Sequence, residues 1–116
     1  MKYMFLIYAE ERNEVQMTPA EREAMLAEYF AFTQATRAKG VYVAGDELKP
    51  TTTATTLRPQ GNQLVPTDGP FAETKEQLGG FYILECQDMD EAVAWAAQIP
   101  SARYGSIEVR PIVNFG

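Results

Sequence analysis

Two stretches of this chain each carry the pattern of a strand, then a helix, then a second strand. The strands are predicted by apolar runs or by alternation of apolar with polar residues, and the helices by apolar residues spaced three and four positions apart. The expected strands span residues 2–9, 41–45, 81–86 and 106–113, and the expected helices span residues 18–39 and 88–99. Two β-α-β units in one chain predict an α+β fold of the ferredoxin-like, split β-α-β type, with an antiparallel sheet and both helices on one face.

The expected helix ends are marked by residues that commonly cap helices. Thr18 can cap the first helix, Pro19 suits its first position, and Glu21 completes a capping box. Gly40 is expected to end that helix, because glycine readily adopts the left-handed backbone that follows a last helical turn. Asp88 is the corresponding cap of the second helix. The residues expected to face the core are Met25, Leu26, Tyr29, Phe30, Phe32 and Thr33 in the first helix and Met89, Ala92, Val93, Trp95 and Ala96 in the second.

The region between the two halves predicts a β-hairpin. Residues 51–58 are rich in threonine, residues 62–66 form a second short extended piece, and residues 59–62 between them have the composition of a tight turn. The thin apolar content of these strands favours an inserted, exposed arm over a central strand of the sheet. Residues 10–16 and 101–105 are expected to be loops.

The segment from Asp68 to Gly80 connects the hairpin to the second half. Asp68-Gly69-Pro70 predicts a tight turn, because Asp can bond its own downstream backbone, Gly can take a positive φ, and Pro fixes φ. Gly79-Gly80 predicts a bend or a close backbone approach before the next strand begins. Special backbone residues and charged side chains occur together here, so this segment is the candidate site.

The first strand divides into two apolar sets, because successive residues of a strand point to opposite faces. One set is Tyr3, Phe5 and Ile7, and the other is Met4, Leu6 and Tyr8. If both helices cover one face, the second set lies on a face that no element of the chain covers. An apolar face of this kind predicts a homodimer packed sheet to sheet.

Length and charge limit the class of protein. A chain of 116 residues suits one domain, which we take to span residues 1–116. The net charge of −6 argues against a surface for nucleic acid or for an anionic membrane, since both need clustered Lys and Arg. The N-terminal apolar run is too short for a signal peptide or a membrane span, which predicts a cytoplasmic protein.

The chain contains no histidine and one cysteine, Cys86. Without histidine there can be no Ser-His-Asp or Cys-His catalytic site and no imidazole-bound zinc. A single cysteine forms no intrachain disulfide and no Cys-rich metal site, and the apolar surroundings of Cys86 predict a buried, unreactive thiol. We therefore expect no metal and no cofactor, and any chemistry must use carboxylates, Lys, Tyr, Arg or backbone groups.

A resemblance to a known family rests first on residues 68–81, which read DGPFAETKEQLGGF. This run resembles the motif that names the DGPF-domain proteins, within the YCII-related family. Residues 1–8 and 106–111 are also similar to that family, so the resemblance extends over essentially the whole chain. It implies a bacterial, cytosolic, dimeric α+β barrel, with a cavity bounded by the sheets and the turn segment.

The resemblance also implies two kinds of role. Some DGPF-type chains are encoded near, or fused to, sigma-factor-like regulators, which implies an accessory role in regulation. A more distant YCII branch includes a lyase that removes a halide from a chlorinated ring compound and is noted for a histidine–aspartate pair. Asp68 is the counterpart of that aspartate, and the histidine has no counterpart in this chain.

Asp68 is the candidate catalytic residue, as a general base or as a hydrogen-bond acceptor for a ligand. The alternative is a structural role, in which its side chain stabilises the following turn. Phe71 beside it and Lys75, which suits an anionic group, are candidate ligand-binding residues.

Three further candidates lie on the expected strands. Tyr8 shares its face with the uncovered apolar set, and Glu108 shares a face with Arg110. If that face lines a dimer cavity, these are its ligand-binding polar groups. The alternative for Glu108 and Arg110 is an ion pair across strands or between subunits.

Two functions follow from these residues. The first is a non-catalytic dimeric module that binds a small molecule, as a sensor or as an accessory to a regulator. The alternative is a lyase- or isomerase-type enzyme for a small anionic or ring substrate, with Asp68 as the general base and Lys75 or Arg110 holding the anion. The missing histidine favours the first function, and the sequence leaves the ligand open.

Overall fold

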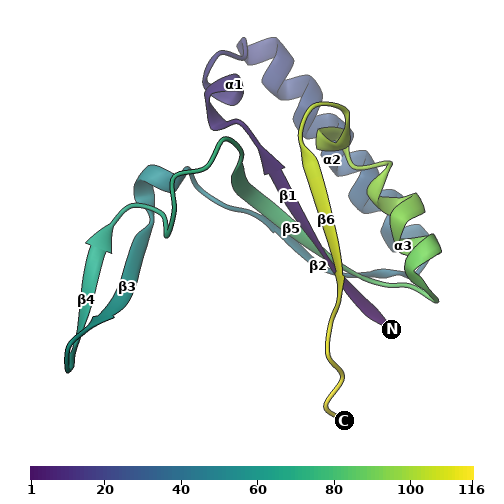
Figure 1. Ribbon diagram of the computed structural model, residues 1–116. Coiled ribbons are helices and arrows are strands. Elements are labelled where there is room, and N and C mark those ends of the chain that lie inside the picture. The colour runs from purple at the N-terminus through teal and green to yellow at the C-terminus, as the bar shows by residue number, and fades with distance from the viewer.

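The computed structural model describes residues 1–116 and contains a four-stranded antiparallel sheet (Figure 1). Its strand order is β2-β5-β1-β6, and every neighbouring pair runs antiparallel. The strands are β1 (Lys2–Ala9), β2 (Tyr42–Glu47), β5 (Gln77–Glu85) and β6 (Ser106–Pro111). The predicted α+β class with an antiparallel sheet is confirmed.

Helices cover one face of this sheet. The α-helices are α1 (Glu11–Val15), α2 (Pro19–Ala38) and α3 (Met89–Ala96), and the 3₁₀ helices are η1 (Thr51–Thr53) and η2 (Pro100–Arg103). Figure 1 shows α2 and α3 on the same side of the sheet. The core lies between these helices and the sheet, and Phe5, Leu84 and Ile99 are its largest fully buried apolar side chains. Cys86 is buried in the same core, as predicted.

The ends of α2 match the sequence signals. The Thr18 hydroxyl accepts a hydrogen bond from the Glu21 amide at 3.1 Å, and the Glu21 carboxylate accepts one from the Thr18 amide at 3.0 Å. This reciprocal pair is the predicted capping box, and it satisfies two backbone donors that have no partner inside the helix. Pro19 occupies the first helical position, and Gly40 follows the helix with a φ of 73°.

The face that α2 turns to the core differs in part from the prediction. Met25, Phe32 and Thr36 are buried, whereas Leu26 and Phe30 are exposed by 47% and 66%. A helix turns about 100° per residue, so the three buried residues share one direction, and Leu26 and Phe30 point about 100° and 140° away from it. The broad apolar stripe is therefore wider than the surface that the sheet offers.

A similar difference occurs in α3. Asp88 caps the helix, as predicted, because its carboxylate accepts a hydrogen bond from the Glu91 amide at 2.9 Å. Ala92 and Ala96 are buried, and Trp95 packs edge-on against Phe32 with ring centroids 6.0 Å apart. The prediction that Met89 and Val93 face the core was wrong, since they are exposed by 38% and 52%. Ala92 and Ala96, and not Met89 and Val93, are the fully buried residues of α3, and their small side chains let the helix lie close to the sheet.

The predicted hairpin forms an arm outside the sheet. It consists of β3 (Thr55–Gln60) and β4 (Gln63–Asp68), and we call residues 55–68 the arm. Gly61 and Asn62 form its turn, and Gly61 has a φ of 63°, as a two-residue hairpin turn with glycine in its first position requires. Figure 1 shows the arm extending away from α2 and α3, on the other side of the sheet.

In the connector from Asp68 to Gly80, the predicted first turn is present. The prediction that Gly79-Gly80 precedes the next strand was wrong. Gly69 has a φ of 107°, which few residues other than glycine adopt. Gly79 and Gly80 lie inside β5 and not before it, at a bulge where the pairing with β1 shifts between Ile7 and Tyr8. A Cβ atom on Gly80 would lie 2.9 Å from the Asp46 carbonyl oxygen, so glycine permits a close approach of two strands.

Four further segments depart from the prediction. Residues 10–16, expected as a loop, contain α1, and residues 101–105 begin inside η2. Neither segment has the apolar spacing that reveals a helix in a sequence. Residues 51–53 form η1, and the first strand of the arm begins only at Thr55. The second strand of the sheet extends to Glu47, because the close approach at Gly80 keeps it paired with β5.

Candidate ligand-binding face

The face of the sheet opposite the helices carries a group of half-buried apolar side chains. Met4 pairs with Ile83 and Leu6 pairs with Phe81, and directly paired residues lie on the same side of a sheet. All four are only partly buried, although the alternate residues Phe5 and Leu84 are fully buried. We call this surface the open face, and define it by Met4, Leu6, Tyr8, Phe81, Ile83, Glu108 and Arg110.

Polar side chains border the open face along β6. Glu108 pairs with Leu6 and Arg110 pairs with Met4. The Arg110 Nε donates to Glu108 Oε2 at 2.7 Å, so the two residues form an ion pair along one strand. Because their side chains are 69% and 42% exposed, this pair contributes little to stability. The terminal amino groups of Arg110 make no hydrogen bond within the chain and can bind an anion.

Tyr8 lies near the end of β1, three residues before α1 begins at Glu11. It pairs with Ser106 on one side and Leu78 on the other, next to the bulge. It is half-buried, and its hydroxyl makes no hydrogen bond within the chain. It can therefore donate a hydrogen bond to a ligand on this face.

The remaining candidates lie on the arm and the connector. Asp68 ends β4 and is exposed, and Phe71 is 77% exposed. The Asp68 side chain does not hold its own turn: the Gly69 amide donates to the Ala54 carbonyl oxygen at 2.8 Å, and the Thr56 hydroxyl donates to the Gly69 carbonyl oxygen at 2.8 Å. Backbone groups and Thr56, and not the Asp68 side chain, therefore stabilise the turn that follows Asp68.

Lys75 lies beside a polar hollow of about 450 Å³ at the base of the arm. Its lining contains no apolar residue: Glu10, Glu11, Arg12, Thr51, Glu73, Thr74, Lys75 and Gln77. This lining combines the cations Arg12 and Lys75 with three glutamates, and the Arg12 Nε donates to Glu10 Oε2 at 3.1 Å, so the hollow has no excess of positive charge. Glu73 and Glu76, on either side of Lys75, lie in irregular backbone.

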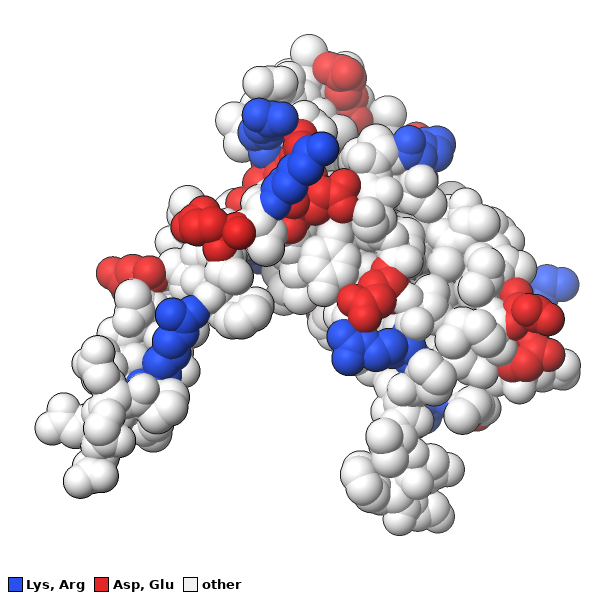
Figure 2. Space-filling view, viewed as in Figure 1, with Lys and Arg blue, Asp and Glu red and all other residues white.

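A single chain separates these candidates into two groups. Tyr8, Glu108 and Arg110 belong to the open face, and Asp68, Phe71 and Lys75 belong to the arm and connector. The sheet order places β6 at the edge opposite β2, from which the chain enters the arm. Figure 2 shows mainly uncharged surface between the arm and β6.

The sequence did not predict the hydrogen bonds that Glu11 makes at the base of the arm. The Glu11 carboxylate accepts hydrogen bonds from the Thr51 amide at 2.7 Å and from the Thr51 hydroxyl at 2.8 Å. The Glu11 amide donates to Gln77 Oε1 at 2.9 Å. These bonds join α1 to the base of the arm and to the start of β5, and we call them the root contacts. Burial and the Glu47 carboxylate raise the pKa of Glu14 on the same helix. The polar sequence of residues 10–16 contains no pattern that predicts the hydrogen bonds of Glu11 with Thr51 and Gln77.

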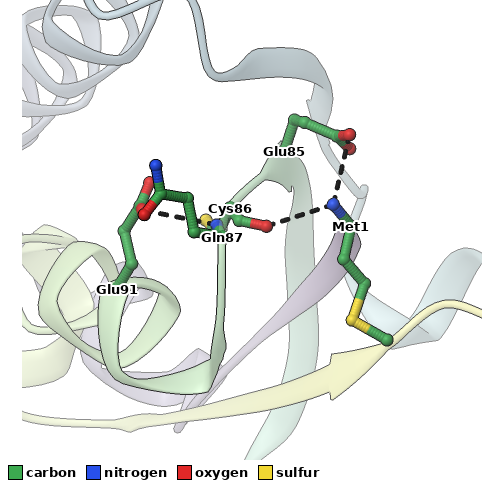
Figure 3. A network of polar contacts seen from close by, with 5 residues as sticks. All are labelled: Met1, Glu85, Cys86, Gln87 and Glu91. Atoms are coloured by element: carbon green, nitrogen blue, oxygen red, sulfur yellow. Dashed lines mark hydrogen bonds and ion pairs between the residues drawn. The ribbon is translucent and has the colours of Figure 1, made fainter.

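A second polar network lies at the opposite end of β5 (Figure 3). The α-amino group of Met1 donates to Glu85 Oε1 at 3.2 Å and to the Cys86 carbonyl oxygen at 3.1 Å. The Gln87 amide donates to Glu91 Oε2 at 3.3 Å. Burial and the nearby Glu91 raise the pKa of the Cys86 thiol, which lowers its nucleophilicity. This network fixes the strand end and offers no reactive group.

A third cluster lies in the helix layer. The hydroxyls of Tyr29 and Ser101 form a short hydrogen bond, and Tyr104 lies 3.3 Å from the Ser101 hydroxyl and 3.1 Å from the Met25 sulfur. Burial raises the pKa of Tyr29 to about 12. Every hydroxyl has a partner, so this cluster serves to join α2 to η2.

Two chain-wide findings complete the description. No group of three or more His, Cys, Asp or Glu side chains is arranged to hold a metal ion. No helix is both long and apolar enough to cross a membrane.

Comparison with known proteins gives three findings. A family model described as the YCII-related domain matches residues 1–116. An uncharacterized protein of Rhizobium meliloti (strain 1021) is 38% identical over 117 residues, which cover 99% of this chain and 94% of the relative. A solved structure of 5-chloro-2-hydroxyhydroquinone dehydrochlorinase from Burkholderia phenoliruptrix AC1100, in complex with 2,5-dihydroxybenzoquinone, is similar at 16% identity and a TM-score of 0.47, over 97% of this chain and 94% of that chain. At that identity and score, the likeness carries no argument about activity.

Proposed function

The chain belongs to the YCII-related family, as its sequence predicted, and we propose that it is a homodimeric module that binds a small molecule between two sheets. The strand order β2-β5-β1-β6 supports the ferredoxin-like plan, in which each β-α-β unit is split by a strand of the other. The assembly that we propose is a dimeric α+β barrel, in which the open faces of two copies face each other.

The observation that carries this proposal is the amount of surface that one chain exposes. Its accessible surface is 8150 Å², whereas a compact monomer of 13.0 kDa exposes about 6,300 Å². Its radius of gyration is 16.2 Å, against about 13 Å for a compact chain of this length. The excess of about 1,800 Å² is more than the roughly 800 Å² that each partner buries in a standard interface. A second copy on the open face would remove much of this excess.

The proposed ligand lies on the open face and contacts its few polar groups. Tyr8 offers a free hydroxyl, and Arg110 offers terminal amino groups beside the Glu108 carboxylate. The apolar side chains around them supply contact area, and a small number of polar groups fix the orientation, which is the usual composition of a small-molecule site. A small molecule with an apolar body and one anionic group fits this arrangement.

The lyase or isomerase alternative depends on Asp68. A carboxylate becomes an effective general base at neutral pH only when burial or a like charge disfavours its ionised form. Asp68 is exposed in a single chain, which supports neither condition. Catalysis by Asp68 therefore stays a prediction, as do an accessory role beside a sigma-factor-like regulator and a cytoplasmic location in bacteria.

The test measures assembly first and ligand binding second. Sedimentation and light scattering over a range of concentrations should give a dimer, and a compact monomer at every concentration would refute the proposal. A thermal-shift screen should then identify ligands, since a ligand at one hundred times its dissociation constant stabilises by about 2.7 kcal/mol. Arg110→Gln and Tyr8→Phe should each reduce the shift.

The matched control is Arg103→Gln. Arg103 is 63% exposed and forms an ion pair with Glu28 at 2.7 Å in the helix layer, so it resembles Arg110 in exposure and pairing but is remote from the open face. If Arg103→Gln and Arg110→Gln reduced the ligand shift equally, the open face would not be the binding site.

A further inference from the structure

The arm presents an apolar face that no part of its own chain covers. Leu57 pairs with Pro66 and Pro59 pairs with Leu64, so these four side chains lie on one face of the hairpin. Leu57 and Leu64 are 57% and 66% exposed. The opposite face carries mainly polar side chains: Thr56, Arg58, Gln60, Gln63, Val65 and Thr67. The arm is therefore amphipathic, although it stands away from any apolar layer.

The composition of the arm is that of a contact surface. Arg58 and Asp68 are its only charged residues, and depletion of charge is typical of the centre of a protein interface. A two-stranded hairpin alone is marginally stable in water at best, because it has no second layer to bury its apolar face. An arm of this kind gains its stability when the face becomes covered.

The two prolines show which part of the arm makes the contact. Gln60 and Gln63 flank the two-residue turn, and the hydrogen-bonded and non-hydrogen-bonded pairs alternate from there. Pro59 and Pro66 fall at non-hydrogen-bonded positions, where the backbone nitrogen points outward to a free edge. Proline has no N–H to donate, so both edges of the arm are blocked against strand addition. Because strand addition at either edge is disfavoured, the apolar face is the surface through which the arm can make a contact.

We infer that the apolar face of the arm docks on a second copy of this chain and forms one wall of the ligand cavity over the partner's open face. The inference rests on the proposed homodimer and adds that each cavity is incomplete without the arm of the other copy. The root contacts of Glu11 with Thr51 hold the base of the arm in place, and β3 and β4 pack extensively only on each other. Figure 1 shows the arm on the same side of the sheet as the open face.

A second copy is the occupant that the surface area favours. The open face and the arm lie on the same side of the sheet, opposite α2 and α3, and both carry apolar side chains that the chain itself does not cover. In a symmetric dimer each patch meets the partner, so one association covers both patches on both chains. The excess exposed surface of about 1,800 Å² per chain is large enough to include the arm as well as the open face.

The first experiment follows hydrogen exchange of the arm amides in the full chain. We expect residues 55–68 to exchange at least tenfold more slowly in the wild-type dimer than in Leu6→Asp, a variant designed to be monomeric. Leu6 lies on the open face, away from the arm of its own chain, so this change can reach the arm amides only through the partner. Equal arm protection in the dimer and in the monomeric variant would overturn the inference while leaving the homodimer intact.

The second experiment changes the arm itself. Leu57→Asp with Leu64→Asp should raise the dimer dissociation constant at least tenfold in sedimentation, and core amides of β1 and β5 should remain protected, which shows that the sheet is folded. The matched control is Leu26→Asp with Val93→Asp, two apolar residues of the helix layer that are 47% and 52% exposed. If the control weakened the dimer and the arm variant did not, the inference would be wrong. A wild-type chain that is monomeric at all concentrations would refute the proposed function as well.

Discussion

Leu6→Asp tests the central contact of the proposed dimer. Leu6 lies in the middle of the open face, paired with Phe81 on one side and Glu108 on the other. Burying a neutral polar group without a hydrogen-bond partner costs about 1–3 kcal/mol, which is a lower limit for the carboxylate that this change introduces. A symmetric interface carries the change twice, so association weakens by about 2–6 kcal/mol, or about 30-fold to about 10⁴-fold in dissociation constant.

Sedimentation velocity over a hundredfold range of concentration measures this change directly. Leu26→Asp is the control, because it makes the same substitution at an exposed position of α2. Circular dichroism and thermal unfolding of the diluted proteins show whether each variant is folded. A Leu6→Asp chain that assembles with wild-type affinity, or a Leu26→Asp chain that loses assembly to the same degree, would refute the reasoning.

Three other predictions concern the single chain. Gly80→Ala should lower the free energy of unfolding by about 1–3 kcal/mol in urea titrations, because its Cβ would lie 2.9 Å from the Asp46 carbonyl oxygen. Gly79→Ala, whose nearest such contact is the Ile7 carbonyl oxygen at 3.9 Å, should change stability far less, and equal losses would contradict this account. The pKa of Tyr29 is raised to about 12 in the folded chain, so its contribution is complete below pH 10 and is lost as pH rises from 10 to 12. Tyr29→Phe should flatten the stability profile over that window, and an unchanged slope would be contrary evidence. Glu11→Gln should weaken the root contacts and speed hydrogen exchange at Thr51 several-fold, with Glu23→Gln on α2 as a control that should leave that exchange rate unchanged.

Local signals in the sequence were sufficient for the order and type of most elements. The capping box of Thr18 and Glu21 acts within four residues, so it could be read without knowledge of the rest of the chain. The alternation of β1 likewise depends only on the period of a strand, and the structure buries Phe5 fully while Leu6 on the opposite face is only partly buried, as predicted. Such signals act at short range and do not depend on tertiary packing.

The rotation of each helix on the sheet could not be predicted in this way. In α2, apolar residues cover a wide arc, and tertiary packing, including the contact of the Phe32 ring with Tyr82 of β5, buries Phe32 and Thr36 while Phe30 is exposed. In α3, Ala92 and Ala96 are buried, whereas the larger Val93 is exposed. The sequence offers more apolar positions than the sheet can cover, and only tertiary packing distinguishes among them.

The grouping of the candidate site residues was also beyond the sequence. Whether Asp68 meets Arg110 depends on the direction of the arm, and that direction is held by the bonds between Glu11 and Thr51. Those two residues are 40 positions apart, and no periodic pattern connects them. The sequence could predict an arm and a face, but their relation depends on this long-range contact and, in our proposal, on a second copy.

This dependence gives a test of Asp68 that separates its two possible roles. Asp68 pairs with Thr55 and lies on the same face of the arm as Leu57 and Leu64, so docking of that face would carry it toward the partner. If Asp68 contacts a ligand in a shared cavity, Asp68→Asn should reduce the ligand-induced thermal shift in the wild-type background and have no further effect in the Leu57→Asp, Leu64→Asp background. If Asp68 acts within its own chain, the loss should be the same in both backgrounds, because changes at independent sites add. If Asp68→Asn leaves every ligand shift unchanged in the wild type, Asp68 has no place in the site. A general base on this chain requires the first result, since only the partner can exclude water from a carboxylate that its own chain leaves exposed.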